Sequence, residues 1–197
     1  MTRMSKIKDE PADIVVYLRD KGLVLKEKSL VAFHEETGKI AAMGTEAEAM
    51  AEKADGDMVV MSPLRQGKIA DYMVTVKLFE YLMSKAFGKK PLRRPVVAVC
   101  VPKGITEVEK KAVEDAVIQA GARELVIADV PVEEFVRDFQ AKFPKLYAKV
   151  KLTIGIGKDE PEKYVTEAFA RILEYAGSEG LSPDRARELF ENAFKSS

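Results

Sequence analysis

The chain has 197 residues, 47% of them apolar and 32% charged, so it can bury a core and stay soluble. Its 32 basic and 32 acidic residues balance, which removes any whole-chain argument for binding nucleic acid or an anionic membrane. A single cysteine and a single histidine exclude an intramolecular disulfide and paired-histidine or multi-cysteine metal sites. No apolar run reaches the roughly 18 residues that span a bilayer, and no secretory signal opens the chain, so we expect a cytoplasmic protein.

The first quarter of the chain predicts strands. Apolar, partly β-branched runs occur at residues 13–19, 23–25, 30–33 and 39–43. Turns at Lys21-Gly22 and Thr37-Gly38 separate them. Strands joined by tight turns indicate an antiparallel meander. His34 follows the run at 30–33, and we interpret it as a surface residue at a strand end.

Residues 45–92 change character. An Ala/Glu-rich helix is predicted at 45–53 and a short strand at 58–61. A helix is predicted at 69–86, where apolar residues recur at helical spacing, and Gly88 is expected to end it. The basic stretch 89–95 is interpreted as a solvated connector rather than a binding patch.

The segment after residue 95 predicts a parallel βαβ unit. Residues 96–101 form an uninterrupted apolar strand, which favours burial on both faces and makes Cys100 a packing residue. Thr106 and Glu109 have the spacing of a capping box, Gly121 ends the helix, and residues 125–128 return as a strand. A helix at 132–143, a strand at 149–156 and helices at 162–176 and from Ser182 follow.

Two segments carry a resemblance to a known family. Residues 63–71 (Pro-Leu-Arg-Gln-Gly-Lys-Ile-Ala-Asp) and 93–109 are similar to stretches of the bacterial actin-like rod-shape proteins of the MreB family, and the similarity extends over about residues 14–131. The resemblance implies an α/β fold: one ribonuclease-H-like half of an actin-like ATPase, with a mixed five-stranded sheet and helices on both faces.

The same resemblance implies a division of the chain. Residues 13–44 and 93–158 would form the actin-like core subdomain, and residues 45–92 an inserted small subdomain. Residues 159–197 would form a C-terminal helical extension in place of the family's second domain, and we expect its helices to cover apolar surface.

The family's phosphate-binding motifs match poorly. Where the resemblance places a Gly- and Thr-containing phosphate hairpin, residues 9–13 read Asp-Glu-Pro-Ala-Asp, with three carboxylates and a proline that has no N–H. Where it places two acids before Pro131, the chain has Asp129 and Val130. Near the expected second phosphate loop, residues 155–158 read Gly-Ile-Gly-Lys, which is also what a strand-to-helix turn looks like. Asp129, Gly155 and Gly157 are therefore vestigial candidates for a nucleotide site.

These departures favour a non-catalytic chain with no cofactor, which is not an enzyme and which acts through protein–protein interaction. The partner would be an MreB-type filament or a second copy of this chain. Binding to nucleic acid is not expected, and any attachment to a membrane would be peripheral. The alternative is a divergent protein that binds ATP and Mg²⁺ at a site completed by dimerisation. A third interpretation is a small-ligand-binding or assembly protein that reuses the half-actin fold.

Overall fold

The computed structural model describes residues 11–53, 57–65, 67–88 and 93–157. All of them belong to one compact unit, residues 1–158, and a second unit comprises residues 159–197. The helices predicted at 162–176 and from Ser182 lie outside the described residues.

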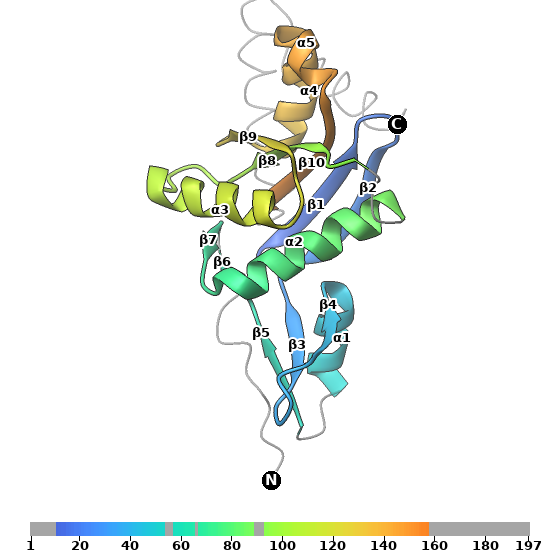
Figure 1. Cartoon of the computed structure of the whole chain (residues 1–197), viewed down its shortest axis with the longest axis vertical. Helices are drawn as coiled ribbons and strands as arrows, with labels where there is room; N and C mark the ends of the chain where they lie inside the picture. The colour runs from blue at the N-terminus through green and yellow to red at the C-terminus, as the bar shows by residue number, and fades with distance from the viewer. Residues whose placement is uncertain (1–10, 54–56, 66, 89–92, 158–197) are drawn as a thin grey trace, which may run out of the picture. The chain divides into compact units, whose positions relative to one another are not determined.

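The central sheet has five strands, ordered β2-β1-β10-β8-β9 (Figure 1). Their bounds are Asp13–Leu18 for β1, Gly22–Lys28 for β2, Val96–Cys100 for β8, Glu124–Ala128 for β9 and Val150–Gly157 for β10. β1 runs antiparallel to β2 and to β10, whereas β10, β8 and β9 are parallel. The expected mixed five-stranded sheet is thus confirmed, and its central strand is the last one in the described sequence.

Helices cover both faces of this sheet, as expected (Figure 1). α2 (Tyr72–Phe87) and α3 (Glu107–Gln119) pack on the face that carries Ile14, Val99 and Ile154. α4 (Val132–Lys142) packs on the other face with Phe135 and Phe139, and the short α5 (Pro144–Tyr147) follows it. Every second residue of β1 is buried and the residues between are partly buried. Successive side chains of a strand point to opposite faces, so those of β1 are divided between the two layers.

A second, three-stranded sheet corrects the predicted meander. Its strands are β3 (Val31–His34), β4 (Ile40–Met43) and β5 (Met58–Met61), in the order β4-β3-β5, with α1 (Thr45–Lys53) beside them. The chain leaves the central sheet where Ser29 and Leu30 are both fully buried, which breaks the strand alternation. The strands at 31–43 thus form a small core of their own with Val60 and Ala47, and the subdomain limits inferred at 44 and 93 stay predictions.

Helix ends follow local chemistry. The Asp71 carboxylate accepts from the Val74 N–H at 3.0 Å, so α2 starts at Tyr72, after a small hairpin of β6 (Leu64–Arg65) and β7 (Lys68–Ile69) that was not predicted. The capping box at α3 is confirmed: Glu109 accepts from the Thr106 N–H at 2.7 Å, and Thr106 accepts from the Glu109 N–H at 3.2 Å. Gly88 ends α2 at φ 70°.

The Glu27 carboxylate fastens three elements together. It is 5% exposed on β2 and accepts from the N–H of Thr45 at 2.7 Å and from Nζ of Lys85 at 2.7 Å. Gly44 fits beneath it at φ 69°, where an added Cβ would overlap Oε2 of Glu27. Burial by itself would raise the pKa of Glu27, but the hydrogen bonds from Lys85 and Thr45 outweigh burial and hold the pKa below its ordinary value.

Glu27→Gln should lower the free energy of unfolding by about 1–2 kcal/mol at pH 7, a modest figure because the partner amine is partly solvated. Folding lowers the pKa of the Glu27 carboxyl group, so this group stabilises the folded protein at pH values above the ordinary carboxyl pKa. The stabilisation disappears as the pH falls through the lower pKa of the folded state. Urea denaturation from pH 7 to pH 3 should therefore show the difference between wild type and variant closing in acid. A difference that is constant with pH would contradict the assigned network.

Gly155 permits a close approach of α4 to the central strand. An added Cβ would lie 2.7 Å from Cβ of Val132 and 2.8 Å from Cγ2 of Val15. At Gly157, two residues further on, an added Cβ meets nothing within 4 Å.

Gly155→Ala should therefore destabilise the fold by about 1–3 kcal/mol through overpacking, whereas Gly157→Ala should leave stability nearly unchanged. Chemical denaturation of the two variants side by side measures this. Adding Val132→Ala to Gly155→Ala should recover part of the loss, and equal stability of both single variants would show that the close approach is absent.

Candidate functional site

Strand pairing brings chemistry-bearing residues to one edge of the central sheet. Asp13 at the start of β1 pairs with Gly157 at the end of β10, and the ends of β8 and β9 pair at Cys100 and Ala128. Asp129 follows Ala128 directly. We call the edge formed by Asp13, Val101, Asp129 and Gly157 the carboxyl edge. In sheets with parallel strands, ligands commonly bind outside these strand ends.

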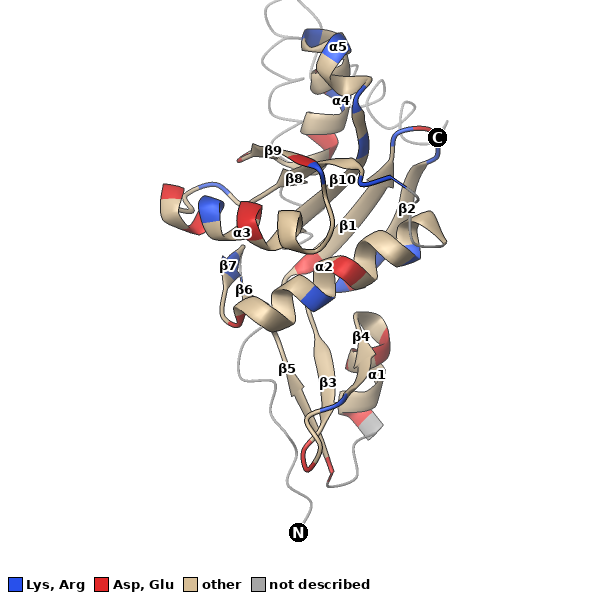
Figure 2. Cartoon of the chain, viewed as in Figure 1, with Lys and Arg blue, Asp and Glu red and all other residues tan. Residues whose placement is uncertain are grey.

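The acids of the carboxyl edge are paired with lysines. Asp13 accepts from Nζ of Lys28. Oδ2 of Asp129 lies 3.3 Å from Nζ of Lys110 on α3, and the same amine lies 2.9 Å from Oε1 of Glu107. These contacts, Glu107's hydrogen bond first and Asp129's second, raise the pKa of Lys110. Figure 2 shows basic and acidic residues interspersed along α3. The carboxyl edge therefore holds lysine amines beside its carboxylates, and their positive charge reduces the repulsion that the carboxylates alone would exert on an anion.

The vestigial candidates fall into different places. Asp129 lies on the carboxyl edge with its side chain 55% exposed, and Gly157 lies there with open space beside its Cα. Gly155 is buried beneath Val132, so its lack of a side chain serves packing. The segment 8–13 is described only from Pro11 onward, where Ala12 is buried and Asp13 begins β1.

Sequence reasoning missed Ser29 and Lys110. The N–H of Ala12, one residue before Asp13, donates to Oγ of Ser29 at 2.9 Å. A serine between a charged and an apolar run carries no recognisable signal of this contact. Lys110 follows the capping box by one residue, and the βαβ topology could have placed it near Asp129 on the next strand end.

Metal and thiol chemistry can be judged from the same residues. Within the described ranges, no three or more His, Cys, Asp or Glu side chains are grouped so as to hold a metal ion. Mg²⁺ bound with a nucleotide needs one or two carboxylates besides phosphate and water. The carboxyl edge offers Asp13 and Asp129, at the ends of strands that β10 and β8 separate. Cys100 is 2% exposed, and burial first and the charge of Glu133 second raise its pKa to about 12, so it is no nucleophile.

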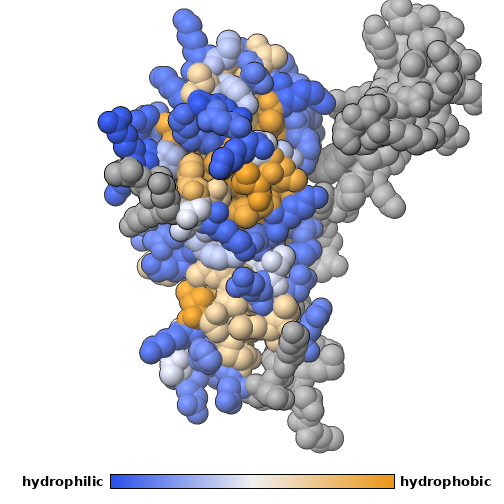
Figure 3. All heavy atoms as spheres, turned by 90° about the vertical axis from the view of Figure 1, so that its right-hand side faces the viewer, coloured by the Kyte–Doolittle hydropathy of each residue, from blue (hydrophilic) through white to orange (hydrophobic). Residues whose placement is uncertain are grey.

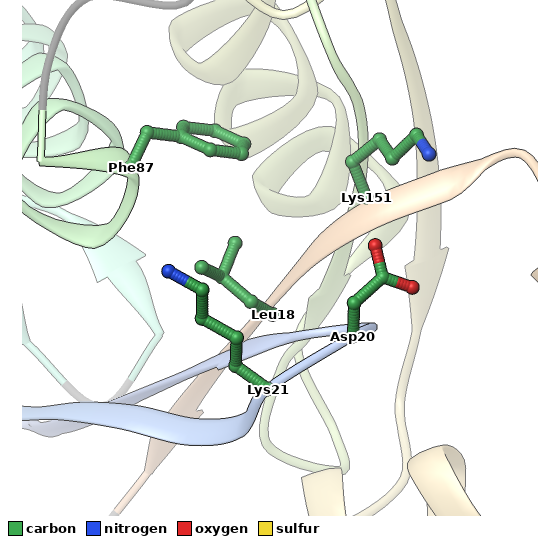
Figure 4. Close-up of a pocket in the computed structure, with 5 residues that line it drawn as sticks. All are labelled: Leu18, Asp20, Lys21, Phe87 and Lys151. Carbon is green, nitrogen blue, oxygen red and sulfur yellow. The ribbon is translucent and has the colours of Figure 1, made fainter.

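A hollow at the opposite end of the strands is a separate feature. It has a volume of about 180 Å³ and is lined by Leu18, Asp20, Lys21, Phe87 and Lys151 (Figure 4). Small-molecule sites usually enclose about 300–1,000 Å³, so this hollow is too small for a nucleotide.

Among the described residues, none of the helices has the length and apolar character needed to cross a membrane.

Comparison with known proteins identifies the relatives of this chain. The sequence model of the MreB/Mbl protein family matches residues 10–162. The cell shape-determining protein Mbl of Bacillus cereus is 34% identical over 120 residues, which cover 61% of this chain and 36% of Mbl. The cell shape-determining protein MreB of Pasteurella multocida is 32% identical over 182 residues, which cover 90% of this chain and 50% of MreB.

The fold has solved neighbours in the same family. Crystal structures of MreB5 of Spiroplasma citri, one bound to ADP and one to AMPPNP, are 28% identical with a TM-score of 0.54. Each match covers 61% of this chain and 36% of MreB5. The chain thus spans about a third to a half of the length of the relatives it matches.

These matches confirm the resemblance and the fold, and they correct one expectation. The prediction that the chain is not an enzyme is wrong as an inference about its class, because MreB-family proteins are actin-like ATPases and two solved neighbours hold ADP and AMPPNP. With a family model that matches residues 10–162, this chain belongs to the MreB/Mbl family of actin-like proteins.

Proposed function

We propose that this chain binds ATP with Mg²⁺ at its carboxyl edge and assembles with other copies or with an MreB-type filament. The observation that carries the proposal is the pairing of Asp13 with Gly157, which places an acid and an open glycine at the strand ends of a fold whose solved neighbours hold ADP and AMPPNP. The earlier alternative, a divergent nucleotide-binding protein, is therefore preferred over a purely non-catalytic one.

The chemistry of the edge supports a role for each residue. Gly157 leaves its backbone accessible to a phosphate, which a side chain would hold at a distance. Lys110 supplies positive charge next to the strand ends. Asp13 is a carboxylate of the type that holds Mg²⁺, and Asp129 is the candidate to orient an attacking water.

A second chain is proposed to complete the site. The described residues supply one face of the carboxyl edge, and residues 11–13 offer a proline and two N–H groups, of which that of Ala12 already bonds Ser29. An actin-like site encloses its nucleotide from two sides, and another copy or a filament subunit that faces the carboxyl edge would supply such a second side. MreB-family proteins polymerise, which supports self-association.

Isothermal titration calorimetry with ATP and Mg²⁺ tests the site. Binding is expected in wild type, and Gly157→Val should weaken it at least about tenfold because a branched side chain fills the space a phosphate needs. Lys21→Ala, in the separate hollow, is the matched control and should bind as wild type does. No heat at millimolar nucleotide with wild type, at protein concentrations that permit dimers, would refute the proposal.

Asp129→Asn should separate binding from turnover. If Asp129 orients water, phosphate release from ATP should fall by about 10²-fold, while the dissociation constant for ATP changes less than about threefold. Phosphate release and calorimetry on the same preparation measure both. A loss of affinity with unchanged turnover per bound nucleotide would place Asp129 in binding instead.

Sedimentation tests the proposed assembly. The chain should pellet with a polymerising MreB, or alone at high concentration, and more so with ATP than with ADP. Gly157→Val should abolish the nucleotide dependence of pelleting without unfolding the protein. If the chain stays in the supernatant in every nucleotide state and leaves polymer length unchanged, assembly through MreB-type filaments is excluded.

A further inference from the structure

Buried hydroxyls gather where the chain passes between its two sheets. The chain leaves the central sheet after β2 and returns after β5, and the two crossings lie side by side at Ser29 and Ser62. Ser29 is 0% exposed and Ser62 is 3% exposed. Two buried hydroxyls at a crossing need partners, and these partners show what the crossing holds together.

Ser29 is bonded in three directions. Its Oγ accepts from the N–H of Ala12 at 2.9 Å, donates to the carbonyl of Leu64 at 2.7 Å and lies 2.9 Å from Oγ of Ser62. The N–H of Ser29 also donates to the carbonyl of Ala12 at 2.9 Å. Both backbone groups of Ala12 are thus fixed by one serine, and Ala12 directly precedes Asp13 of the carboxyl edge.

Ser62 closes the same network from the returning crossing. Its Oγ lies 3.0 Å from the Leu64 carbonyl, so both serines converge on one acceptor. Next to it, the N–H of Ala70 donates to the carbonyl of Pro63 at 2.8 Å, and Oγ1 of Thr75 lies 3.1 Å from the same carbonyl, so the crossing is fixed to the start of α2. Residue 12, both crossings and the first turn of α2 therefore share one small hydrogen-bonded group.

Apolar packing is divided at this level. The second sheet has its own cluster of Leu30, Ala32, Ala42, Ala47 and Val60, and Met43 of β4 is the side chain of this sheet that packs against the core of the central sheet. Figure 3 shows apolar side chains in an upper and a lower group, with a band of hydrophilic side chains between them. Small hydroxyls can change bonding partners at little steric cost, whereas a continuous apolar core resists such movement. At the junction, hydrogen bonds between small polar groups therefore take the place of much of the apolar packing.

We propose that Ser29 and Ser62 form a hinge that couples the carboxyl edge to the second sheet. A displacement of residues 12–13 pulls on Ser29 and, through Ser62 and the Leu64 carbonyl, moves both crossings and the strands β3 and β5 attached to them. The hinge itself follows from these contacts; its use as a reporter of bound nucleotide rests on the proposed function.

Hydrogen exchange of the protein without nucleotide tests the hinge. Ser29→Ala and Ser62→Ala should each speed exchange in β3, β5 and residues 12–14 by about fivefold, because each removes a buried hydrogen bond. β8 and α3 should change less than about twofold. Ser84→Ala, an exposed serine on α2, is the matched control and should change nothing.

The double variant and a conservative variant sharpen the result. If the two serines act as one unit, Ser29→Ala with Ser62→Ala should exchange little faster than either single variant. Should Ser29→Ala fail to fold, Ser29→Cys keeps the size and a weak donor and gives the same comparison. Faster exchange on only one side of the junction, or uniformly through the protein, would overturn the hinge.

A second arm adds ATP and Mg²⁺ and follows residues 31–61. Wild type should change its exchange there on binding, and Ser29→Ala should lose that change while calorimetry still shows binding. Retention of the change would overturn the coupling. If calorimetry shows no binding at all, the proposed function fails, and the exchange measured without nucleotide still decides whether the hinge exists.

Discussion

The position of β10 is the constraint on which the rest of the structure depends. This strand lies between β1 and β8, antiparallel to one and parallel to the other, and so closes the sheet. Its register sets Gly157 against Asp13, and its glycine at 155 admits Val132 of α4 onto the second face. Without β10, β1 and β8 would present two unpaired strand edges and the carboxyl edge would lose its centre.

Local chemistry was predictable where it acts over a few residues. The capping box of Thr106 and Glu109, the Gly88 helix end, the buried strand at 96–100 and the βαβ unit all follow from short-range patterns. The sheet to which a strand belongs does not, because alternation tells which side chains face a core and says nothing of which core. β3 and β4 were therefore placed in the wrong sheet.

The candidate site shows the same limit. Asp129, Gly155 and Gly157 were all proposed from a motif, and the motif could not show that the surroundings of Gly155 are those of a packing glycine. The expectation of a chain that is not an enzyme came from comparing residues 9–13, Asp129 with Val130, and residues 155–158 with the family's motifs. A comparison of the sequence alone could not show that Gly157 lies beside residues 9–13, because β10 brings Gly157 next to Asp13 from more than 140 residues further along the chain.

The late position of the central strand also affects how the protein is made. During synthesis, β1, β2, β8 and β9 leave the ribosome before β10, so the growing chain cannot complete its sheet until residue 157 has emerged. Until then the apolar edges of β1 and β8 are open to pairing with other nascent chains. The small sheet of β3, β4 and β5 has no such delay, because all its strands lie within residues 31–61 and can form early.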